Sequence, residues 1–499
     1  MSVSLLLEMA VSGNPDSDAV ACDGIAWTTA QLDDLAYRGA GIIQACSART
    51  VAYVGTGGAM LPLLIFAAAR AGVPFAPLNY RLSADVLHSL LGRLPAPLIV
   101  VDQGFEDLVN LAGAVTMRAD DFISAATTAE PTAAECDPDD VAVLLFTSGT
   151  TSKPKAVELS HANLTSYITS SVDFLSAEPS DVALISVPPY HIAGVSAALS
   201  NLYAGRKIVY LRRFDPAEWI RTVRIQAVTT ATVVPTMLAR ILTVLETEPT
   251  PLPSLRNLAY GGSKAPQPLV RKALDLLPDV GFVNAYGLTE TSSTIAVLTP
   301  DDHRTAHGSA DHTVAGRLGS VGRPLPAIEI EIRAEDGNIL GAGEIGELYV
   351  RGDQVSGRYS EIGSVLDEHG WFPTRDLASV DADGYLYIAG RSDDTIIRGG
   401  ENISPAELED VLVEHPAVHE VAVVGAEDPE WGQITVAVVV PAPGAQTNAE
   451  ELRTFVRENL RGSRTPDRII FRDELPTTAT GKVVRRELVA QIAAESVRS

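Results

Sequence analysis

The residues best suited to bind a polyphosphate follow one apolar run, in the string LLFTSGTTSKPKAV (Leu144 to Val157). A turn of small hydroxyl residues and glycine offers backbone amides and hydroxyl donors to phosphate oxygens, and lysine adds a positive charge. The GxxxxGK[ST] pattern of a Walker A loop is absent. On composition alone the string fits either a phosphate-binding loop or a Ser/Thr-rich surface loop.

Six further motifs follow this string in a fixed order along the chain. They are PPYH (188–191), NAYGLTE (284–290), GELYVRG (346–352), GWFPTRD (370–376), GRSDDTIIRGGENISPAELE (390–409) and PTTATGKVVRREL (476–488). Together the seven motifs resemble the adenylate-forming superfamily, which comprises acyl-CoA synthetases, peptide-synthetase adenylation domains and beetle luciferases. The resemblance covers nearly the whole chain, and within the superfamily it favours the acyl-CoA synthetase branch.

The resemblance implies an ATP and AMP site. Its loop for the β- and γ-phosphates corresponds to Thr147, Ser148, Gly149, Thr150, Thr151 and Lys155. The family usually has glycine where this chain has Ser152 and Ala156, and both departures stiffen the loop. The nucleotide set further includes Gly262, Ser263, Asn284, Ala285, Tyr286 and Gly287.

Four residues of that region receive separate roles from the resemblance. Asn284 is expected to read the adenine amino group, and the ring of Tyr286 to stack on the base. Thr289 would bond the α-phosphate as a candidate catalytic residue. Glu290 would hold Mg²⁺, a hard cation that prefers carboxylate and phosphate oxygens. Taken alone, Glu290 would be an ordinary solvated carboxylate.

The remaining motif residues imply a moving C-terminal domain. Asp376 is expected to bind both ribose hydroxyls, and Arg391 to contact ribose or phosphate, although either could form a surface salt bridge. Lys482 would bridge the substrate carboxylate and the α-phosphate as a catalytic cation. Asp393 would be the hinge. Gly399 and Gly400 are the residues expected to contact coenzyme A.

The acyl pocket is less defined. The resemblance places His191 at its entrance as a further candidate catalytic residue, and a core histidine bonded to backbone is the alternative. Ala193, Gly194 and Gly261 are small, which leaves room for an apolar tail or ring. The amino-acid-activating branch has an aspartate in this region, and Val187 to Gly194 contains none. Medium-chain fatty, aromatic and sterol-derived acids all remain open.

These residues need a scaffold of strands and helices, and the pattern predicts an α/β fold. Helical spacing in 32–45, a short strand in 49–58, a buried helix in 60–71 and a strand in 73–79 indicate parallel α/β layers. Strict alternation with Asp-Gly turns after Gly316 indicates antiparallel hairpins. We therefore predict an N-terminal domain, 1–391, of two stacked α/β subdomains plus a distorted β-barrel, and a small mobile α+β domain, 392–499.

Composition limits which partners and which cellular compartments fit this chain. The formal charge of −25 disfavours nucleic acid and anionic membranes as partners. Three isolated cysteines, Cys22, Cys46 and Cys136, argue against a disulfide framework and fit a cytoplasmic protein. The N-terminus lacks a basic region before its apolar residues, and the longest apolar run, Met60 to Ala69, is too short to span a bilayer.

The predicted activity is that of an acid–thiol ligase. ATP, Mg²⁺ and coenzyme A are the expected cofactors, and a small carboxylic acid is the expected partner, with fatty acid metabolism as one setting. Acyl-AMP would form with release of pyrophosphate, and coenzyme A would then displace AMP. The alternatives are a ligase that loads a carrier protein and a nucleotide-binding relative without catalysis. Oligomeric state is not readable from the sequence.

Overall fold

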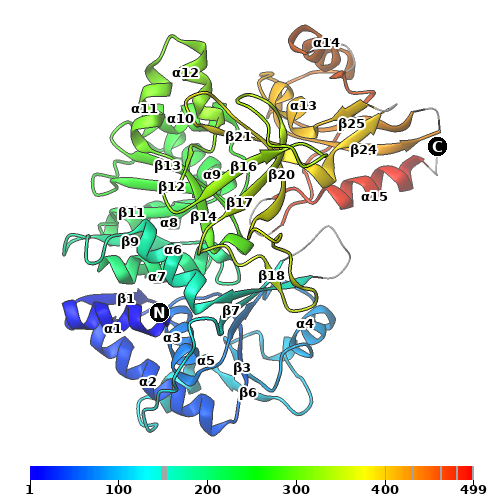
Figure 1. Ribbon diagram of the computed structural model, residues 1–499. Coiled ribbons are helices and arrows are strands. Elements are labelled where there is room, and N and C mark those ends of the chain that lie inside the picture. Colours follow the sequence, from blue (N-terminus) through cyan, green and yellow to red (C-terminus); the bar gives the residue numbers. More distant parts are fainter. Residues whose placement is uncertain (148–153, 399–400, 430, 461–463, 479–481, 497–499) are drawn as a thin grey trace.

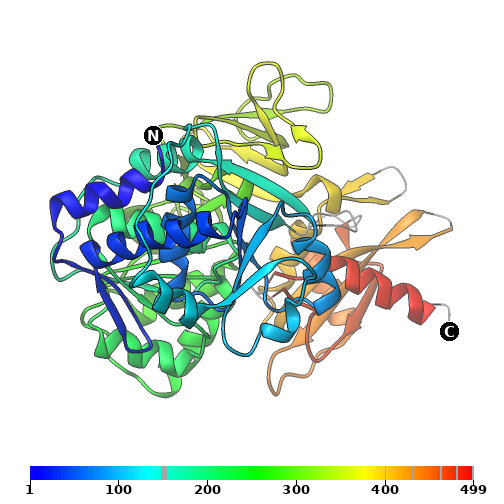
Figure 2. The same ribbon diagram turned by 90° about the horizontal axis from the view of Figure 1, so that it is seen from below.

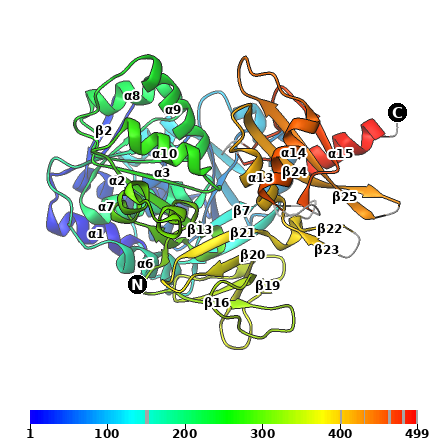
Figure 3. The same ribbon diagram turned by 90° about the horizontal axis from the view of Figure 1, so that it is seen from above.

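The computed structural model describes residues 1–147, 154–398, 401–429, 431–460, 464–478 and 482–496. It is an α/β protein with a large N-terminal domain and a smaller C-terminal domain, as predicted (Figure 1). Figures 2 and 3 show the C-terminal elements, coloured orange and red, gathered on one side of the larger domain. No helix in the described part of the chain is long and apolar enough to cross a membrane.

The first subdomain is built on an eight-stranded sheet in the order β19-β18-β8-β7-β4-β3-β5-β6. Its strands are β3 (Thr50–Val54), β4 (Phe75–Leu78), β5 (Pro97–Val101), β6 (Val115–Arg118), β7 (Val141–Thr147), β8 (Lys155–Ser160), β18 (Arg358–Tyr359) and β19 (Gly363–Ser364). Strands β3 to β7 pair in parallel, and β8 returns antiparallel to β7. Both faces of β3 are buried, which explains its continuous apolar sequence.

The second subdomain is built on a nine-stranded sheet in the order β15-β14-β13-β12-β11-β9-β10-β1-β2. Its strands are β1 (Asp18–Cys22), β2 (Ile25–Thr28), β9 (Val182–Ile185), β10 (Lys207–Tyr210), β11 (Thr230–Val233), β12 (Asn257–Gly261), β13 (Gly281–Leu288), β14 (Ser293–Leu298) and β15 (Arg323–Pro324). Strands β9 to β13 are parallel, so their carboxyl ends meet at one edge, where open α/β sheets usually bind ligands.

One hydrophobic core lies between the two sheets. It contains apolar residues of both sheets and of α1 (Ser4–Gly13), α2 (Thr29–Ala45), α3 (Met60–Ala71), α6 (His161–Ser171) and α7 (Ile192–Ala204). Every residue of α3 is buried, which accounts for its long apolar run. α5 (Ala119–Ala126) also packs into this core, and the remaining helices of the domain are α4 (Ala84–Leu91), α8 (Pro216–Ile225), α9 (Pro235–Thr247), α10 (Gln267–Leu276), α11 (Pro300–Gly308) and α12 (His312–Gly316).

The predicted hairpins after Gly316 form a four-stranded antiparallel sheet. Its strands are β16 (Glu329–Arg333), β17 (Gly346–Arg351), β20 (Phe372–Val380) and β21 (Leu386–Arg391). Ile295 and Ala296 of β14 join its core, so this third unit closes against the second sheet. The contact brings the ends of β13 and β20 together.

The C-terminal domain has its own sheet and two apolar cores. The strands are β22 (Ile396–Arg398), β23 (Glu401–Ile403), β24 (Val418–Asp428), β25 (Gly432–Pro441) and β26 (Arg468–Phe471), and the helices are α13 (Pro405–Leu412), α14 (Ala449–Asn459) and α15 (Arg485–Ser496). β24 and β25 form a long hairpin against which α13 and α15 pack.

Candidate active site

The base of the phosphate loop is a β-hairpin. β7 ends at Thr147 and β8 begins at Lys155, and these two residues face each other across the antiparallel pair. Sequence reasoning placed Lys155 in a loop, whereas the structure makes it the first residue of a strand. Its Nζ lies 5.5 Å from the centre of the Tyr359 ring. The predicted loop residues Ser148, Gly149, Thr150 and Thr151 lie outside the described residues.

Two residues missed by sequence reasoning hold the base of this loop. The backbone amide of Ala156 donates to the Glu361 carboxylate, with 3.2 Å to Oε2. Arg93 forms an ion pair with Glu361 and donates through Nη1 to the carbonyl of Pro154 at 2.8 Å. These contacts join the segment after α4 and the loop after β18 to the start of β8. No local sequence motif predicts them.

β12 and β13 place the predicted nucleotide residues side by side. Gly261 pairs with Ala285 in the parallel register, and a Cβ on Gly261 would come within 2.1 Å of the Ala285 carbonyl oxygen. Gly262 follows with φ +82°, a left-handed conformation that favours glycine. The strand pair therefore needs glycine here and brings 261–263 against 284–287.

The Asn284 amide already has one partner. Its Nδ2 donates to the carbonyl of Ser320 over 3.2 Å, and its Oδ1 accepts no hydrogen bond from the described residues. An oxygen acceptor is therefore available to a donor group such as an exocyclic amine. Thr289 and Glu290 follow in a short 3₁₀ turn, Thr289–Thr291, between β13 and β14.

Glu290 is held from two sides by the segment before β19. Its backbone carbonyl accepts from the Ser356 amide at 2.9 Å, and its Oε1 accepts from the Tyr359 hydroxyl at 2.8 Å. Burial, with the neighbouring Glu290 charge second, raises the pKa of Tyr359, so the phenol stays protonated and donates. Oε2 of Glu290 accepts no hydrogen bond from the described part of the chain.

Asp376 occupies an inward position of β20 and is only 5% exposed. The preceding residue, Arg375, has φ +64°, a left-handed backbone conformation that is uncommon within a strand. The Tyr286 hydroxyl donates to Oδ2 at 2.5 Å, and Nε of Arg391 lies 3.4 Å from Oδ1. Burial raises the pKa of Asp376, while the Arg391 charge and the Tyr286 hydrogen bond act in the opposite direction.

Lys482 reaches this cluster from the C-terminal domain. It stands at the base of a hairpin in which the Thr478 amide donates to the Lys482 carbonyl at 2.7 Å. Lys482 is an exposed residue, and partial desolvation followed by the Arg391 charge lowers its pKa, while Asp376 and Asp394 oppose this. The same ammonium, after burial, lowers the pKa of His191. Lys482 therefore shares its electrostatic environment with Asp376, Arg391 and His191.

The predicted pocket residues surround the start of α7. His191 is the N-cap residue of this helix, and its Nδ1 accepts from the Ala193 amide at 3.2 Å. Nδ1 is therefore an unprotonated acceptor, consistent with the lowered pKa of the ring. A Cβ on Gly194 would lie 2.6 Å from the Pro188 carbonyl oxygen, so the close turn requires glycine. Ala193 is half-buried beside it.

Ser263 and the next residue lie at the junction between the two domains. Ser263 itself is half-buried. Lys264 pairs with Asp410 of α13 over 2.6 Å. Lys264 of the N-terminal domain thus has its partner in the C-terminal domain.

The predicted hinge, Asp393, lies in a 3₁₀ turn, Ser392–Asp394, that joins β21 to β22. The Ser404 hydroxyl donates to the Ala389 carbonyl at 2.5 Å, close to this turn. Arg485 at the start of α15 forms a bidentate pair with Glu409 and lies 3.4 Å from Asp394. The coenzyme A glycines, Gly399 and Gly400, lie outside the described residues, and the domain boundary at 391/392 stays a prediction.

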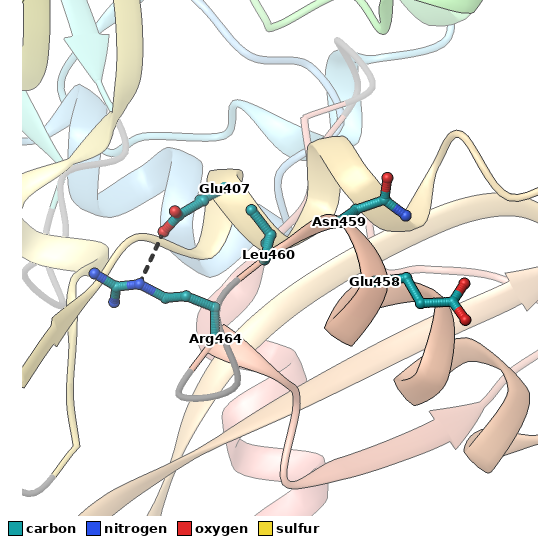
Figure 4. Close-up of a pocket in the computed structure, with 5 residues that line it drawn as sticks. All are labelled: Glu407, Glu458, Asn459, Leu460 and Arg464. Atoms are coloured by element: carbon teal, nitrogen blue, oxygen red, sulfur yellow. Dashed lines mark ion pairs between the residues drawn. The ribbon is translucent and has the colours of Figure 1, made fainter.

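A surface groove of about 510 Å³ on the C-terminal domain is a separate feature (Figure 4). It is lined by Glu407, Glu458, Asn459, Leu460 and Arg464. Arg464 is engaged by Glu407 at 3.3 Å and by Glu401 at 3.5 Å. With its cation paired and two carboxylates on its wall, the groove is unsuited to a polyphosphate, and it is separate from the predicted nucleotide residues of β13, β20 and the β7–β8 hairpin.

The described residues contain no group of three or more side chains able to hold a metal ion by themselves. Glu290 supplies a single carboxylate beside the phosphate-loop strand. This donor set fits Mg²⁺ bound mainly through substrate phosphates and water, the usual arrangement for this ion in nucleotide sites.

Comparison with known proteins decides the family. Residues 7–360 match the AMP-binding enzyme family, and residues 407–482 match the AMP-binding enzyme C-terminal domain. The chain belongs to the AMP-binding enzyme family. Feruloyl-CoA synthase of an Amycolatopsis species is 34% identical over 95% of this chain and 96% of its own length.

Two further relatives extend the comparison. A fatty acid–[acyl-carrier-protein] ligase, ScoC of Streptomyces coeruleorubidus, is 32% identical over 97% of this chain and 95% of its own. The structure of o-succinylbenzoate-CoA synthetase of Bacillus subtilis with its acyl-adenylate intermediate has a TM-score of 0.84, 32% identity and 97% coverage of both chains. This member of the AMP-binding family is thus an ATP-dependent acid–thiol ligase of the acyl-CoA synthetase branch, acting through acyl-AMP.

Proposed function

We propose that the chain activates an aromatic carboxylic acid, and that the two catalytic steps use two orientations of the C-terminal domain, as the resemblance implied. The observation that carries the proposal is the placement of Lys482. A cation from the C-terminal domain shares its surroundings with the Tyr286–Asp376–Arg391 cluster and with His191. This is the arrangement that formation of acyl-AMP requires.

The N-terminal domain is proposed to bind the nucleotide. The acceptor oxygen of Asn284 suits the adenine amino group, and the Tyr286 ring suits the base. Asp376 is proposed to take the ribose hydroxyls, since a carboxylate oxygen with one donor still has acceptor capacity. Arg391 would contact ribose or phosphate. The loop 147–151 with Lys155 would bind the β- and γ-phosphates, and Thr289 the α-phosphate.

Glu290 is proposed as the Mg²⁺ ligand. Its support is the Tyr359 hydrogen bond, which fixes one carboxylate oxygen and leaves the other without a hydrogen bond from the described residues. When bound, Mg²⁺ would neutralise part of the negative charge on the phosphates. Tyr359 would hold the Glu290 carboxylate, and the Ser356 amide would hold the Glu290 backbone carbonyl.

The first step needs positioning and charge, not a protein nucleophile. A carboxylate oxygen of the substrate bonds to the α-phosphorus, and the bond from phosphorus to the pyrophosphate oxygen breaks. Lys482, which comes from the C-terminal domain, would stabilise the added negative charge. His191 is neutral, because burial and the Lys482 charge lower its pKa. As a neutral ring at the pocket entrance, His191 would not compete with Lys482 for the substrate carboxylate.

The second step is proposed to follow a rotation of the C-terminal domain about Asp393. Rotation would withdraw Lys482 and bring the face of Gly399 and Gly400 to the pocket for the pantetheine arm. The thiolate of coenzyme A then bonds to the acyl carbon, and AMP leaves. The small C-terminal domain and the short connecting turn support such a movement.

The substrate class is proposed from the relatives and the small residues of the pocket. The feruloyl and o-succinylbenzoate enzymes are named for aromatic acids. Ala193 is small and half-buried beside His191, which leaves room at the start of α7, whereas Gly194 and Gly261 are in close contact with backbone carbonyl oxygens. A fatty acid transferred to a carrier protein is the second candidate, because ScoC is named for that reaction. The three free cysteines support a reducing compartment, the cytoplasm, as the proposed location.

A ligation screen tests the proposal. Cinnamic, phenylacetic and benzoic acids, straight-chain fatty acids of several lengths and amino acids would each be incubated with ATP, Mg²⁺ and coenzyme A. We expect aromatic acids to give the highest kcat/KM for acyl-CoA. Higher kcat/KM for fatty acids, with transfer to an added carrier protein, would favour the second candidate.

The metal role is tested with Glu290→Gln. Since the amide replaces a carboxylate ligand, the variant should need a higher Mg²⁺ concentration for half-maximal pyrophosphate release, with little change in melting temperature. Equal activity of variant and parent at limiting Mg²⁺ would remove Glu290 from the metal role.

A further inference from the structure

Gln354 is a buried amide that reaches from the third unit into the turn behind Thr289 and Glu290. It lies between β17 and β18 and is 1% exposed. Its Nε2 donates to two backbone carbonyls, those of Thr291 and Thr294, each at 2.9 Å. One side chain thus spans both ends of the connection from the 3₁₀ turn to β14.

The connection that Gln354 spans is strained. Ser292 has φ 55° and Ser293 has φ 120°, and neither residue is glycine. Residues in such sparsely populated conformations persist only where surrounding contacts hold them, and they cluster at functional sites. The two hydrogen bonds from Gln354 act on the residues immediately before and after this pair.

The segment 354–361 also contacts both sides of the proposed phosphate site. The Ser356 amide donates to the Glu290 carbonyl at 2.9 Å, and the Ser356 hydroxyl donates to the Glu158 carbonyl of β8. Tyr359 donates to the Glu290 carboxylate at 2.8 Å and pairs with Val157. Gln354 is the fully buried member at the start of this connection between β8 and the Glu290 turn.

We propose that Gln354 is a positioning residue for adenylation, which sets the orientation of Thr289 and Glu290 by clamping the strained turn behind them. The inference rests on the roles proposed above for these two residues. Gln354 itself would touch neither nucleotide nor acyl substrate. Its loss should therefore affect the first half-reaction, which uses the phosphates and metal, and spare the second.

The test uses Gln354→Met in the full-length protein, because methionine keeps the unbranched shape and removes both donors. Thr165→Val is the matched control, since it also removes a buried side-chain donor. The Thr165 hydroxyl donates to the His161 carbonyl at 2.8 Å, away from the site. Three quantities are compared: ATP–pyrophosphate exchange, thioester formation from supplied acyl-adenylate, and the affinity for Mn²⁺–ATP measured by electron paramagnetic resonance.

We expect Gln354→Met to lower kcat of exchange by about tenfold or more and to weaken Mn²⁺–ATP binding, because lost orientation is lost transition-state stabilisation. Thioester formation and the KM for coenzyme A should stay within about twofold of the parent. Thr165→Val should leave both half-reactions unchanged. Equal loss of both half-reactions in Gln354→Met, or loss of neither, would overturn the inference.

Glu290→Gln measured in parallel separates this inference from the proposed function. Weaker Mn²⁺–ATP binding in Glu290→Gln with none in Gln354→Met would overturn the positioning role and keep the metal role. The opposite pattern would overturn the metal role of Glu290 and keep Gln354 as the residue that holds the turn. Weakening in both variants supports both.

Discussion

The Tyr286 hydroxyl donates to Oδ2 of Asp376 over 2.5 Å, and Asp376 is a buried carboxylate. In Tyr286→Phe the carboxylate loses its donor while the ring remains. A hydrogen bond to a charged group contributes about 1.5–3 kcal/mol, so the KM for ATP should rise roughly tenfold. Tyr385→Phe is the matched control, since the Tyr385 hydroxyl, just before β21, donates to Asp302 of α11 at 2.6 Å.

The same variant has a predicted pH signature. Burial already raises the pKa of Asp376, and the Tyr286 hydrogen bond opposes that rise. Removing the bond raises the pKa further, and the ionised carboxylate is the form that accepts ribose hydroxyls. The acid limb of kcat/KM for ATP should therefore move to higher pH in Tyr286→Phe, and an unmoved limb would contradict the ribose role of Asp376.

Lys482→Ala should separate the half-reactions. The variant loses the cation beside the α-phosphate, so pyrophosphate release should fall by at least about 100-fold. Thioester formation from supplied acyl-adenylate should remain close to normal, because the proposed rotation has by then withdrawn Lys482. Lys272→Ala, which breaks a surface pair with Glu246 at 2.7 Å, should change neither step. Parallel loss of both steps would make Lys482 structural.

Asp393→Pro tests the hinge between β21 and β22. Proline fixes φ near −65° and removes an amide donor, so the turn should be confined to one conformation. We expect pyrophosphate release to persist and most acyl-CoA formation to be lost, measured as separate half-reactions. Selective loss of the other step would also place the hinge here. Uniform loss with a lower melting temperature would indicate misfolding, and no loss would place the hinge elsewhere.

The Lys264–Asp410 pair joins the domains in the conformation that presents Lys482. Both side chains are about half exposed, at 44% and 54%, so the pair should contribute under about 1 kcal/mol and weaken with salt. A double-mutant cycle of Lys264→Ala and Asp410→Ala on the adenylation rate should give a coupling of that size. A coupling that is insensitive to salt would contradict an exposed ion pair.

His161 should make stability depend on pH. Its buried Nδ1 accepts from the Val3 amide at 3.2 Å, and burial lowers its pKa from the ordinary 6.5 to about 4. Between pH 6.5 and about 4, His161 is therefore protonated in the unfolded chain and neutral in the folded chain. Stability from this group is complete above 6.5 and falls by about 3 kcal/mol as the pH drops to 4.

Denaturant unfolding of the parent and of His161→Gln at several pH values measures this contribution. Carboxylates titrate in the same range in both proteins, so the difference between the two curves isolates the histidine. A parent curve parallel to that of His161→Gln across the window would show that His161 protonates equally in both states.

The sequence predicted the elements whose burial leaves a local signature. The helix Met60–Ala71 matches the predicted bounds, because it is an apolar run that is buried along its whole length. The motif residues Tyr286, Asp376 and Arg391 were also predicted, and the structure brings them into contact. Their roles stay predictions.

Other parts left no local signal. β8 begins at Lys155 because its pairing with β7 and β18 extends the strand to the edge of the loop, and such pairing is not encoded in neighbouring residues. Glu361 and Tyr359 are polar residues of an irregular segment, and Gln354 looks like any exposed amide. Their partners lie 60 to 268 positions away in the chain, so only the folded structure reveals them.

The segment 354–361 has a consequence for building hybrid enzymes. In chain order it belongs to the antiparallel unit, between β17 and β20, but its hydrogen bonds go to β8 and to the Glu290 turn. A hybrid that exchanges residues 346–391 between relatives would carry these eight residues away from their partners. Crossovers placed after Glu361, so that the recipient keeps its own segment, should give active recombinants more often than crossovers at Gly346.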